Sequence, residues 1–126
     1  GSYKQISIPD PDENIFPPCI KLLLNGSKQD GRKRALFLLM NFFKSLGVSD
    51  EGIERRIEEW NKKNYSPLKK GYIQSQLIWY KRNSARLPPN CDKPNYQELN
   101  VCKPDELCRQ IKNPINYAFK KYFRKR

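Results

Sequence analysis

The chain has 126 residues, enough for one domain with a modest hydrophobic core, and its 25 lysines and arginines against 13 acidic residues and no histidine give it a formal net charge of +12. This surplus predicts a polyanionic partner, while two tryptophans, seven tyrosines and six phenylalanines argue against a disordered basic tail. No apolar run approaches the roughly eighteen residues of a membrane span, and Gly1 and Ser2 resemble an expression scar, so we expect neither a membrane protein nor a secreted one.

An extended segment precedes the first predicted helix. Residues 1–14 contain two prolines and three acidic residues, and we expect an extended lead-in that need not be ordered. A single domain is predicted over 15–126. Proline in the first turn and glycine just past the end favour a short helix over 20–24, which Pro18 opens and Gly26 closes.

Three longer helices are predicted next. The apolar residues of 35–46 indicate a buried helix that stops at Gly47. Ser49 is a natural N-cap for another helix, in which apolar residues recur at spacings of four and three, namely Ile53, Ile57 and Trp60. A basic connector over 62–70 then leads to a helix over 71–84.

The character of the chain changes at Ala85. The prolines and asparagines of 88–95 argue against a helix there, and we expect an irregular loop of about fifteen residues. A short helix is predicted over 104–111 and another over 114–119, followed by a basic tail over 120–126. The sequence therefore predicts a mainly α fold.

Four cysteines are separated by 71, 10 and 5 residues: Cys19, Cys91, Cys102 and Cys108. Disulfides are rare in cytosolic proteins, so metal ligation and simple burial are the main alternatives. Structural zinc sites generally include a close C-x2-C pair, which this chain lacks, whereas an iron–sulfur cluster is wider and accepts thiolates from separate elements. The spacing favours a cluster, and zinc ligation or ordinary burial remain open.

Basic residues gather before the helix predicted over 35–46. Such side chains attract phosphates, arginine can donate two hydrogen bonds to one phosphate, and a helix N-terminus adds backbone donors. Three consecutive residues combine these features: Arg32, Lys33 and Arg34. Tyr72, beside Lys70, is a candidate for stacking on bases, whereas Trp79 and Tyr80 are expected to pack in the core.

The cysteines lie in segments with a distinctive pattern, which are Phe16-Pro17-Pro18-Cys19-Ile20, Pro88-Pro89-Asn90-Cys91, Val101-Cys102 and the run 107–117. The most specific part is the Cys-x5-Cys of Cys102 and Cys108, followed by Ile-Lys-Asn-Pro. Together they resemble the C-terminal domain of the large subunit of archaeal and eukaryotic DNA primases, over roughly 15–123. The resemblance implies two helical lobes packed around a [4Fe-4S] cluster that all four cysteines hold, with a long irregular loop before the third ligand.

The same resemblance implies nucleic-acid contacts. Arg32 and Lys44 fall on a family arginine and a family lysine that touch the nucleic-acid backbone. Trp60 resembles a tryptophan near that surface, although its phase with the apolar residues before it suits the core equally well. Lys70 and Tyr72 match a Lys-Gly-Tyr segment beside the template and the initiating nucleotide. Where eukaryotic members have a histidine and a second arginine, this chain has Lys33 and Leu36.

The function implied by the resemblance is that of a non-catalytic domain in DNA replication. It would bind template DNA and the 5′-triphosphate end of the initiating RNA primer, while the small subunit of the primase supplies the polymerase chemistry. No carboxylate pair suited to two-metal phosphoryl transfer stands out. We expect it in the cytoplasm or nucleoid of an archaeon, or in a eukaryotic nucleus. The alternatives are a zinc-stabilised nucleic-acid-binding module, a cluster-less third primase subunit, and a redox or base-excising iron–sulfur enzyme.

Overall fold

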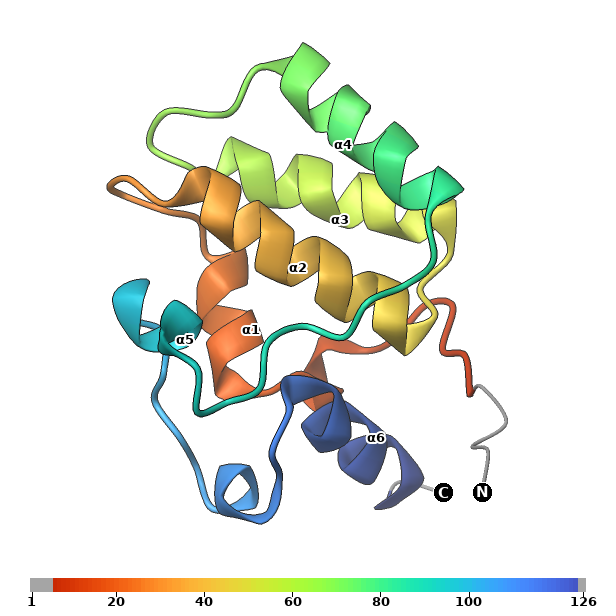
Figure 1. Cartoon of the computed structure of the whole chain (residues 1–126), viewed down its shortest axis with the longest axis vertical. Coiled ribbons are helices and arrows are strands. Elements are labelled where there is room, and N and C mark those ends of the chain that lie inside the picture. The colour runs from red at the N-terminus through yellow and green to blue at the C-terminus, as the bar shows by residue number, and fades with distance from the viewer. Residues whose placement is uncertain (1–5, 125–126) are drawn as a thin grey trace.

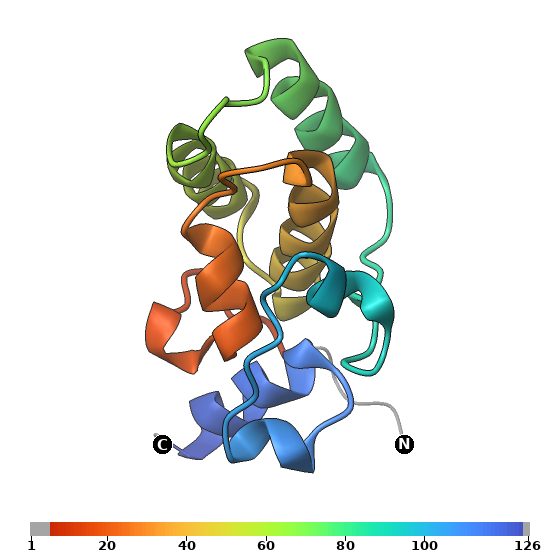
Figure 2. The same cartoon turned by 90° about the vertical axis from the view of Figure 1, so that its left-hand side faces the viewer.

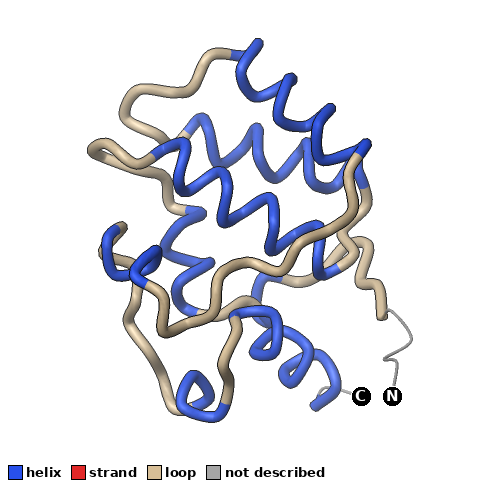
Figure 3. Tube along the Cα trace, in the orientation of Figure 1, coloured by secondary structure: helices blue, strands red, loops and turns tan. Residues whose placement is uncertain are grey.

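Helices make up the regular structure of residues 6–124, which are the residues that the computed structural model describes, and no strand occurs among them (Figures 1 and 3). This confirms the predicted mainly α fold, and the arrangement of two lobes around a cluster stays a prediction. The proposed scar at Gly1 and Ser2 lies outside the described residues. Within 6–124, every helix is too short or too polar to cross a bilayer.

Helix α2 (Arg32–Leu46) forms the centre of the core. Nine of its fifteen residues are buried, so it is covered on most sides. Three helices pack against it, namely α1 (Pro18–Leu24), α3 (Asp50–Lys62) and α6 (Pro114–Arg124). Helix α4 (Lys70–Arg82) adds two side chains to the same apolar cluster. Figure 1 shows α3 and α4 towards one end of the molecule and α1 and α6 towards the other.

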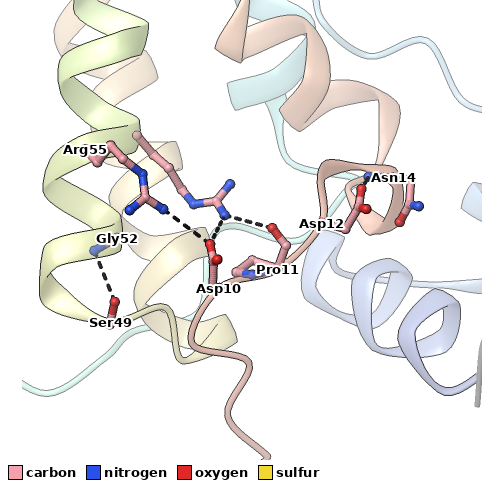
Figure 4. A network of polar contacts seen from close by, with 8 residues as sticks. Asp10, Pro11, Asp12, Asn14, Ser49, Gly52 and Arg55 are labelled. Carbon is pink, nitrogen blue, oxygen red and sulfur yellow. Dashed lines mark hydrogen bonds and ion pairs between the residues drawn. The ribbon is translucent and has the colours of Figure 1, made fainter.

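The boundaries of the first helices follow their sequence signals. Pro18 occupies the first turn of α1. The hydroxyl of Ser49 accepts a hydrogen bond of 3.1 Å from the N–H of Gly52 and so caps α3, as Figure 4 shows. Gly47 ends α2 with a φ of +88°, a conformation that glycine adopts without steric cost. These predicted starts and stops are confirmed.

Two predicted features between α4 and α6 were wrong. A short helix, α5 (Pro94–Glu98), lies where an irregular loop was expected. Proline is compatible with a helix at its first position, since the N–H that it lacks would have no intrahelical partner there. The helix predicted over 104–111 is only a single 3₁₀ turn, η2 (Leu107–Gln110).

Two further predictions, on the end of the last helix and on the burial of Trp79, were also wrong. Helix α6 continues to Arg124, through most of the predicted basic tail of 120–126, and 125–126 lie outside the described residues. Trp79, expected in the core, has 46 % of its surface exposed. Tyr80 is buried as predicted, and its hydroxyl accepts a 3.0 Å hydrogen bond from the buried amide of Asn41.

Within the predicted lead-in of 1–14, residues 6–12 are neither helix nor strand, and several of them hydrogen-bond to the helices. Ile8 is buried, and its N–H donates a 2.9 Å hydrogen bond to the carbonyl of Leu46 at the end of α2. Asp10 accepts hydrogen bonds from Arg55 at 3.3 Å and Arg56 at 2.9 Å on α3 (Figure 4). A 3₁₀ turn, η1 (Glu13–Ile15), then leads into α1.

We predict that Gly47→Ala destabilises the protein by about 1–2 kcal/mol, because alanine is strained at this positive φ. A Cβ at position 47 would also lie 2.7 Å from the Cα of Ser7, so the lead-in would have to shift. The free energy of unfolding in urea measures the effect. Gly71→Ala is the matched control, since no atom lies within 4 Å of a Cβ there, and it should be neutral or stabilising by up to about 1 kcal/mol. Equal stability of the two variants would contradict the prediction.

Candidate metal centre and nucleic-acid interface

The four cysteines lie on four separate segments in the half of the molecule that contains α1 and α6. Cys19 is in the first turn of α1, Cys91 precedes α5, Cys102 follows α5, and Cys108 is in η2. Figures 1 and 2 both show these segments in that half. All four thiols are free and partly buried. The chain therefore offers four unoxidised sulfur donors from distant parts of its sequence.

Asn113 anchors the loop that carries Cys91. Its buried side-chain amide donates hydrogen bonds to the carbonyl of Pro88 at 2.8 Å and to the side chain of Asn90 at 3.0 Å. The N–H of Cys91 donates to the carbonyl of Lys112 at 2.8 Å. These bonds fix the irregular loop against the beginning of α6, more than twenty residues further along the chain.

A second set of hydrogen bonds fixes Cys108. Its N–H donates to one carboxylate oxygen of Asp105 at 3.0 Å, and the hydroxyl of Tyr117 donates to the other at 2.6 Å. Because Tyr117 lies on α6, these bonds join η2 to α6. Tyr96 of α5 is also buried, and its hydroxyl donates to the carbonyl of Pro89 at 2.5 Å. The cysteine-bearing segments are thus held by protein contacts.

The thiols are close enough to influence one another electrostatically. Burial, followed by the neighbouring thiols of Cys91, Cys108 and Cys102, raises the pKa of Cys19 to about 12. Burial, followed by Cys108 and Cys102, raises the pKa of Cys91 to about 11. Burial is also the largest cause that raises the pKa of Cys108. Without a bound metal, each of these shifts favours the uncharged thiol.

The arrangement does not match a site for one metal ion. Within residues 6–124, no three cysteine, histidine or acidic side chains lie together as ligands of a single ion. A zinc ion needs four ligands at about 2.0–2.3 Å from one centre, whereas an iron–sulfur cluster presents several irons to its thiolates. The four free thiols match the number and type of donors that an iron–sulfur cluster takes, but the described residues do not gather them into a metal site.

The three consecutive cations at the start of α2 point to different neighbours. Residues in sequence project about 100° apart around a helix. The guanidinium of Arg32 donates to the carbonyl of Ser66, in the connector before α4. The ammonium of Lys33 lies 4.6 Å from the ring centroid of Tyr72, on α4. Arg34 lines a pocket between α2 and α5.

The Lys33 side chain therefore links the first turn of α2 to that of α4, and we call Arg32, Lys33, Lys70 and Tyr72 in these two turns the cationic face. Neither helix has a side-chain N-cap: Gly31 precedes α2, and Lys69 precedes α4 without a capping hydrogen bond. Backbone N–H groups at both ends thus lack the usual side-chain acceptor, which favours an anion. Of these four sequence-predicted residues, the structure brings Lys33 and Tyr72 into contact, and Lys70 begins the same helix as Tyr72.

Lys44 lies apart from the cationic face, because it follows Arg32 by twelve residues, or about 18 Å along the axis of α2. Its ammonium is 3.9 Å from the carboxylate of Asp50. It lines a small cavity of about 60 Å³ between α2, α3 and α4, together with Lys81. Sequence reasoning missed Lys81, which has no signal beyond its charge. The predicted nucleic-acid contact of Lys44 stays a prediction.

Two aromatic residues differ from the predicted site. Trp60 is only 1 % exposed and belongs to the core, so its ring offers no surface for a base, and we do not carry it into the proposed interface. Phe37 lies in the helix predicted to be buried but is 47 % exposed, in the pocket beside Arg34.

The fold and the site define an all-helical, strongly basic protein with four free cysteines on separate segments. The chain is similar to the DNA primase large subunit PriL of Thermococcus kodakarensis, at 27 % identity over 87 % of this chain and 37 % of that protein. PriL of Pyrococcus abyssi is 23 % identical over the same shares, and that of Pyrococcus horikoshii is 23 % identical over 86 % of this chain and 37 % of the relative.

These similarities confirm the predicted relationship to the primase large subunit. The chain spans little more than a third of the length of the relatives it matches. No protein-family model matches the chain, and no solved structure gives a significant match.

We predict that Asn113→Ala destabilises the protein by at least about 2 kcal/mol. The buried carbonyl of Pro88 and the N–H of Ile115 would both lose their hydrogen-bond partner, and each such loss costs about 1–3 kcal/mol. Urea denaturation measures the loss, and limited proteolysis should show faster cleavage in 83–93. The control is Asn116→Ala in the first turn of α6, whose exposed side chain should leave stability within about 0.5 kcal/mol. Similar stabilities of the two variants would show that Asn113 is not the anchor.

Proposed function

We propose that the chain is the C-terminal, iron–sulfur, nucleic-acid-binding domain of a DNA primase large subunit. It binds template DNA and the 5′-triphosphate end of the initiating RNA primer, and it has no polymerase chemistry of its own. The catalytic small subunit acts on the same primer within the primase complex, in the cytoplasm or nucleoid of an archaeon. The similarity to PriL over 87 % of the chain supports the assignment to the subunit.

The observation that carries the binding role is the pairing of two uncapped helix starts in the cationic face. Arg32 and Lys33 reach from α2 to the connector and to α4, where Lys70 and Tyr72 begin the next helix. Both helix starts have uncapped backbone N–H groups, and Lys33 links the two turns through its contact with Tyr72. A terminal triphosphate carries several charged oxygens, and both arginine and a helix start bind such groups well. Tyr72, half-buried against Lys33, keeps an aromatic ring beside the phosphates.

The four thiols support the cofactor assignment. In the holo protein, Cys19, Cys91, Cys102 and Cys108 hold a [4Fe-4S] cluster, which supplies iron–thiolate cross-links between α1 and the segments on both sides of α5. The hydrogen bonds of Asn113 and Asp105 hold two of these ligand segments in place. Retention of all four cysteines, free of disulfides, favours this over a cluster-less third primase subunit.

We predict that the purified wild-type protein is brown and contains iron rather than zinc, and that Cys91→Ser loses the colour and much of the stability. Cys19 and the three later cysteines close a loop of about seventy residues, and losing the metal releases that cross-link. Visible absorbance, elemental analysis and urea denaturation report the outcome. Lys93→Ala, an exposed change two residues away, should keep the iron and the colour. A brown and equally stable Cys91→Ser protein would refute the assignment of this ligand.

We predict that Arg32→Ala and Lys70→Ala each weaken binding to an RNA primer with a 5′-triphosphate on a DNA template. Each variant removes one cation, so the slope of log affinity against log salt should become shallower by about 0.7 for each single-strand phosphate that is no longer neutralised. Fluorescence anisotropy over a salt series measures both quantities. Wild-type protein should bind the triphosphate primer more tightly than the same primer with a 5′-hydroxyl.

The control for these variants is Lys120→Ala. It removes the same charge from an exposed position on α6, towards the other end of the molecule (Figure 1). Its affinity and salt slope should match the wild type. Two results would contradict the proposed binding role: Lys120→Ala weakening binding as much as Lys70→Ala, or equal wild-type affinity for the triphosphate junction and a random single strand. Either result would mean that net charge alone explains the binding.

A further inference from the structure

A pocket of about 220 Å³ lies between α2 and α5, beside the cationic face. Its α2 wall includes Lys33, Arg34 and Phe37, and its α5 wall includes Asn95 and Glu98. Small-molecule sites typically have about 300–1,000 Å³, so this pocket suits one planar group rather than a large ligand. None of the sequence signals pointed to α5 as part of a binding site.

Phe37 gives the pocket an aromatic surface. Its neighbours Leu36 and Leu38 are 2 % and 1 % exposed, whereas Phe37 is 47 % exposed. The ring therefore lies at the edge of the core with part of its surface open to the pocket. Every nucleobase has a flat π face, and stacking on an aromatic side chain is worth about 1–3 kcal/mol per base.

The opposite wall offers polar groups suited to the edge of a base. Asn95 presents an amide, which both donates and accepts hydrogen bonds, and Glu98 presents a carboxylate, which accepts them. Among the residues that the structure describes, neither side chain makes a hydrogen bond or an ion pair. Base edges carry N–H donors and acceptors side by side, so both groups match that chemistry.

Arg34 places a positive charge at the same pocket. A Cβ at Gly31 would lie 3.4 Å from the guanidinium of Arg34 and 2.7 Å from the side chain of Leu99, which follows α5. The bare glycine therefore lets Arg34 and the α5 segment approach each other. Within 6–124, Arg34 has no ion-pair partner, so its guanidinium is available for a phosphate. Lys33, which also contacts Tyr72, joins the pocket to the cationic face.

We propose that the pocket between α2 and α5 binds one unpaired base of a single-stranded nucleic acid, with the base stacked on Phe37, its edge bonded by Asn95 and Glu98, and the adjoining phosphate on Arg34. This rests on the proposed function, because the cationic face holds the strand from which that base extends. The pocket adds a base-dependent contribution to binding that otherwise depends on phosphates. The occupant is a nucleotide within a strand, because the cations of the pocket continue into the cationic face through Lys33.

The test compares a labelled oligothymidylate with an abasic strand of the same length, by fluorescence anisotropy on the purified wild-type chain and Phe37→Leu. Leucine keeps an apolar side chain but removes the ring. The variant should bind oligothymidylate about 5- to 150-fold more weakly, which is the loss of one stacked base, and the abasic strand with unchanged affinity. Phe37→Trp, which restores an aromatic ring, should regain the oligothymidylate affinity.

The matched control is Phe123→Leu, since Phe123 has a similar exposure of 44 % but lies on α6, and it should leave both affinities unchanged. Melting temperatures confirm that each variant is folded. If Phe37→Leu binds both strands as the wild type does, or weakens both equally, the pocket does not hold a base. Arg32→Ala and Lys70→Ala separate this failure from that of the proposed function, because they should weaken both strands whether or not the pocket takes part.

Discussion

The burial of α2 is the constraint on which the rest of the structure depends. This helix contacts α1, α3 and α6, and its middle turns are almost wholly apolar. Polar chemistry is therefore displaced to its ends and to the elements that cover it. At the N-terminal end, three successive basic residues leave the helix in three directions, towards the connector before α4, towards α4 itself and towards α5. One short stretch of sequence thus serves two adjacent surfaces.

The half of the molecule that contains the cysteines is also held together by side-chain hydrogen bonds. Besides its buried apolar residues, this half has side-chain hydrogen bonds between distant segments, those of Asn113 and Tyr96 to the proline-rich loop and that of Tyr117 to Asp105. These bonds position the backbone around the thiols while leaving the thiols themselves free. Such an arrangement suits a cofactor that is added to a largely formed scaffold.

Much of the fold could be predicted from sequence because its signals are local. Proline at the start of α1, the Ser49 cap and the glycine after α2 act within one turn of where they occur. The misplaced elements depended on tertiary context. Pro94 is equally consistent with a loop and with the first residue of a helix, and only the packing of Tyr96 into the core decides between them.

The candidate site, too, could be predicted where its signals are local and not where they depend on tertiary context. Charge and spacing identified the basic residues and the cysteines, but exposure is a tertiary property, so the assignments of Trp60, Trp79 and Phe37 needed coordinates. Periodicity places a residue on a helix face without saying whether another element covers that face. For this reason the sequence did not predict that α2 and α5 line one pocket, since the residues of its two walls are distant in sequence.

Helix α5 has only five residues and is flanked by Cys91 and Cys102. So short a helix has little rigidity of its own, and the positions of Asn95 and Glu98 follow from how firmly the chain is clamped on either side. A change in how firmly those two sulfurs are held would therefore move Asn95 and Glu98, which lie opposite Phe37. With the proposed cluster bound to Cys91 and Cys102, the stiffness of the pocket wall would therefore depend on a group outside the pocket.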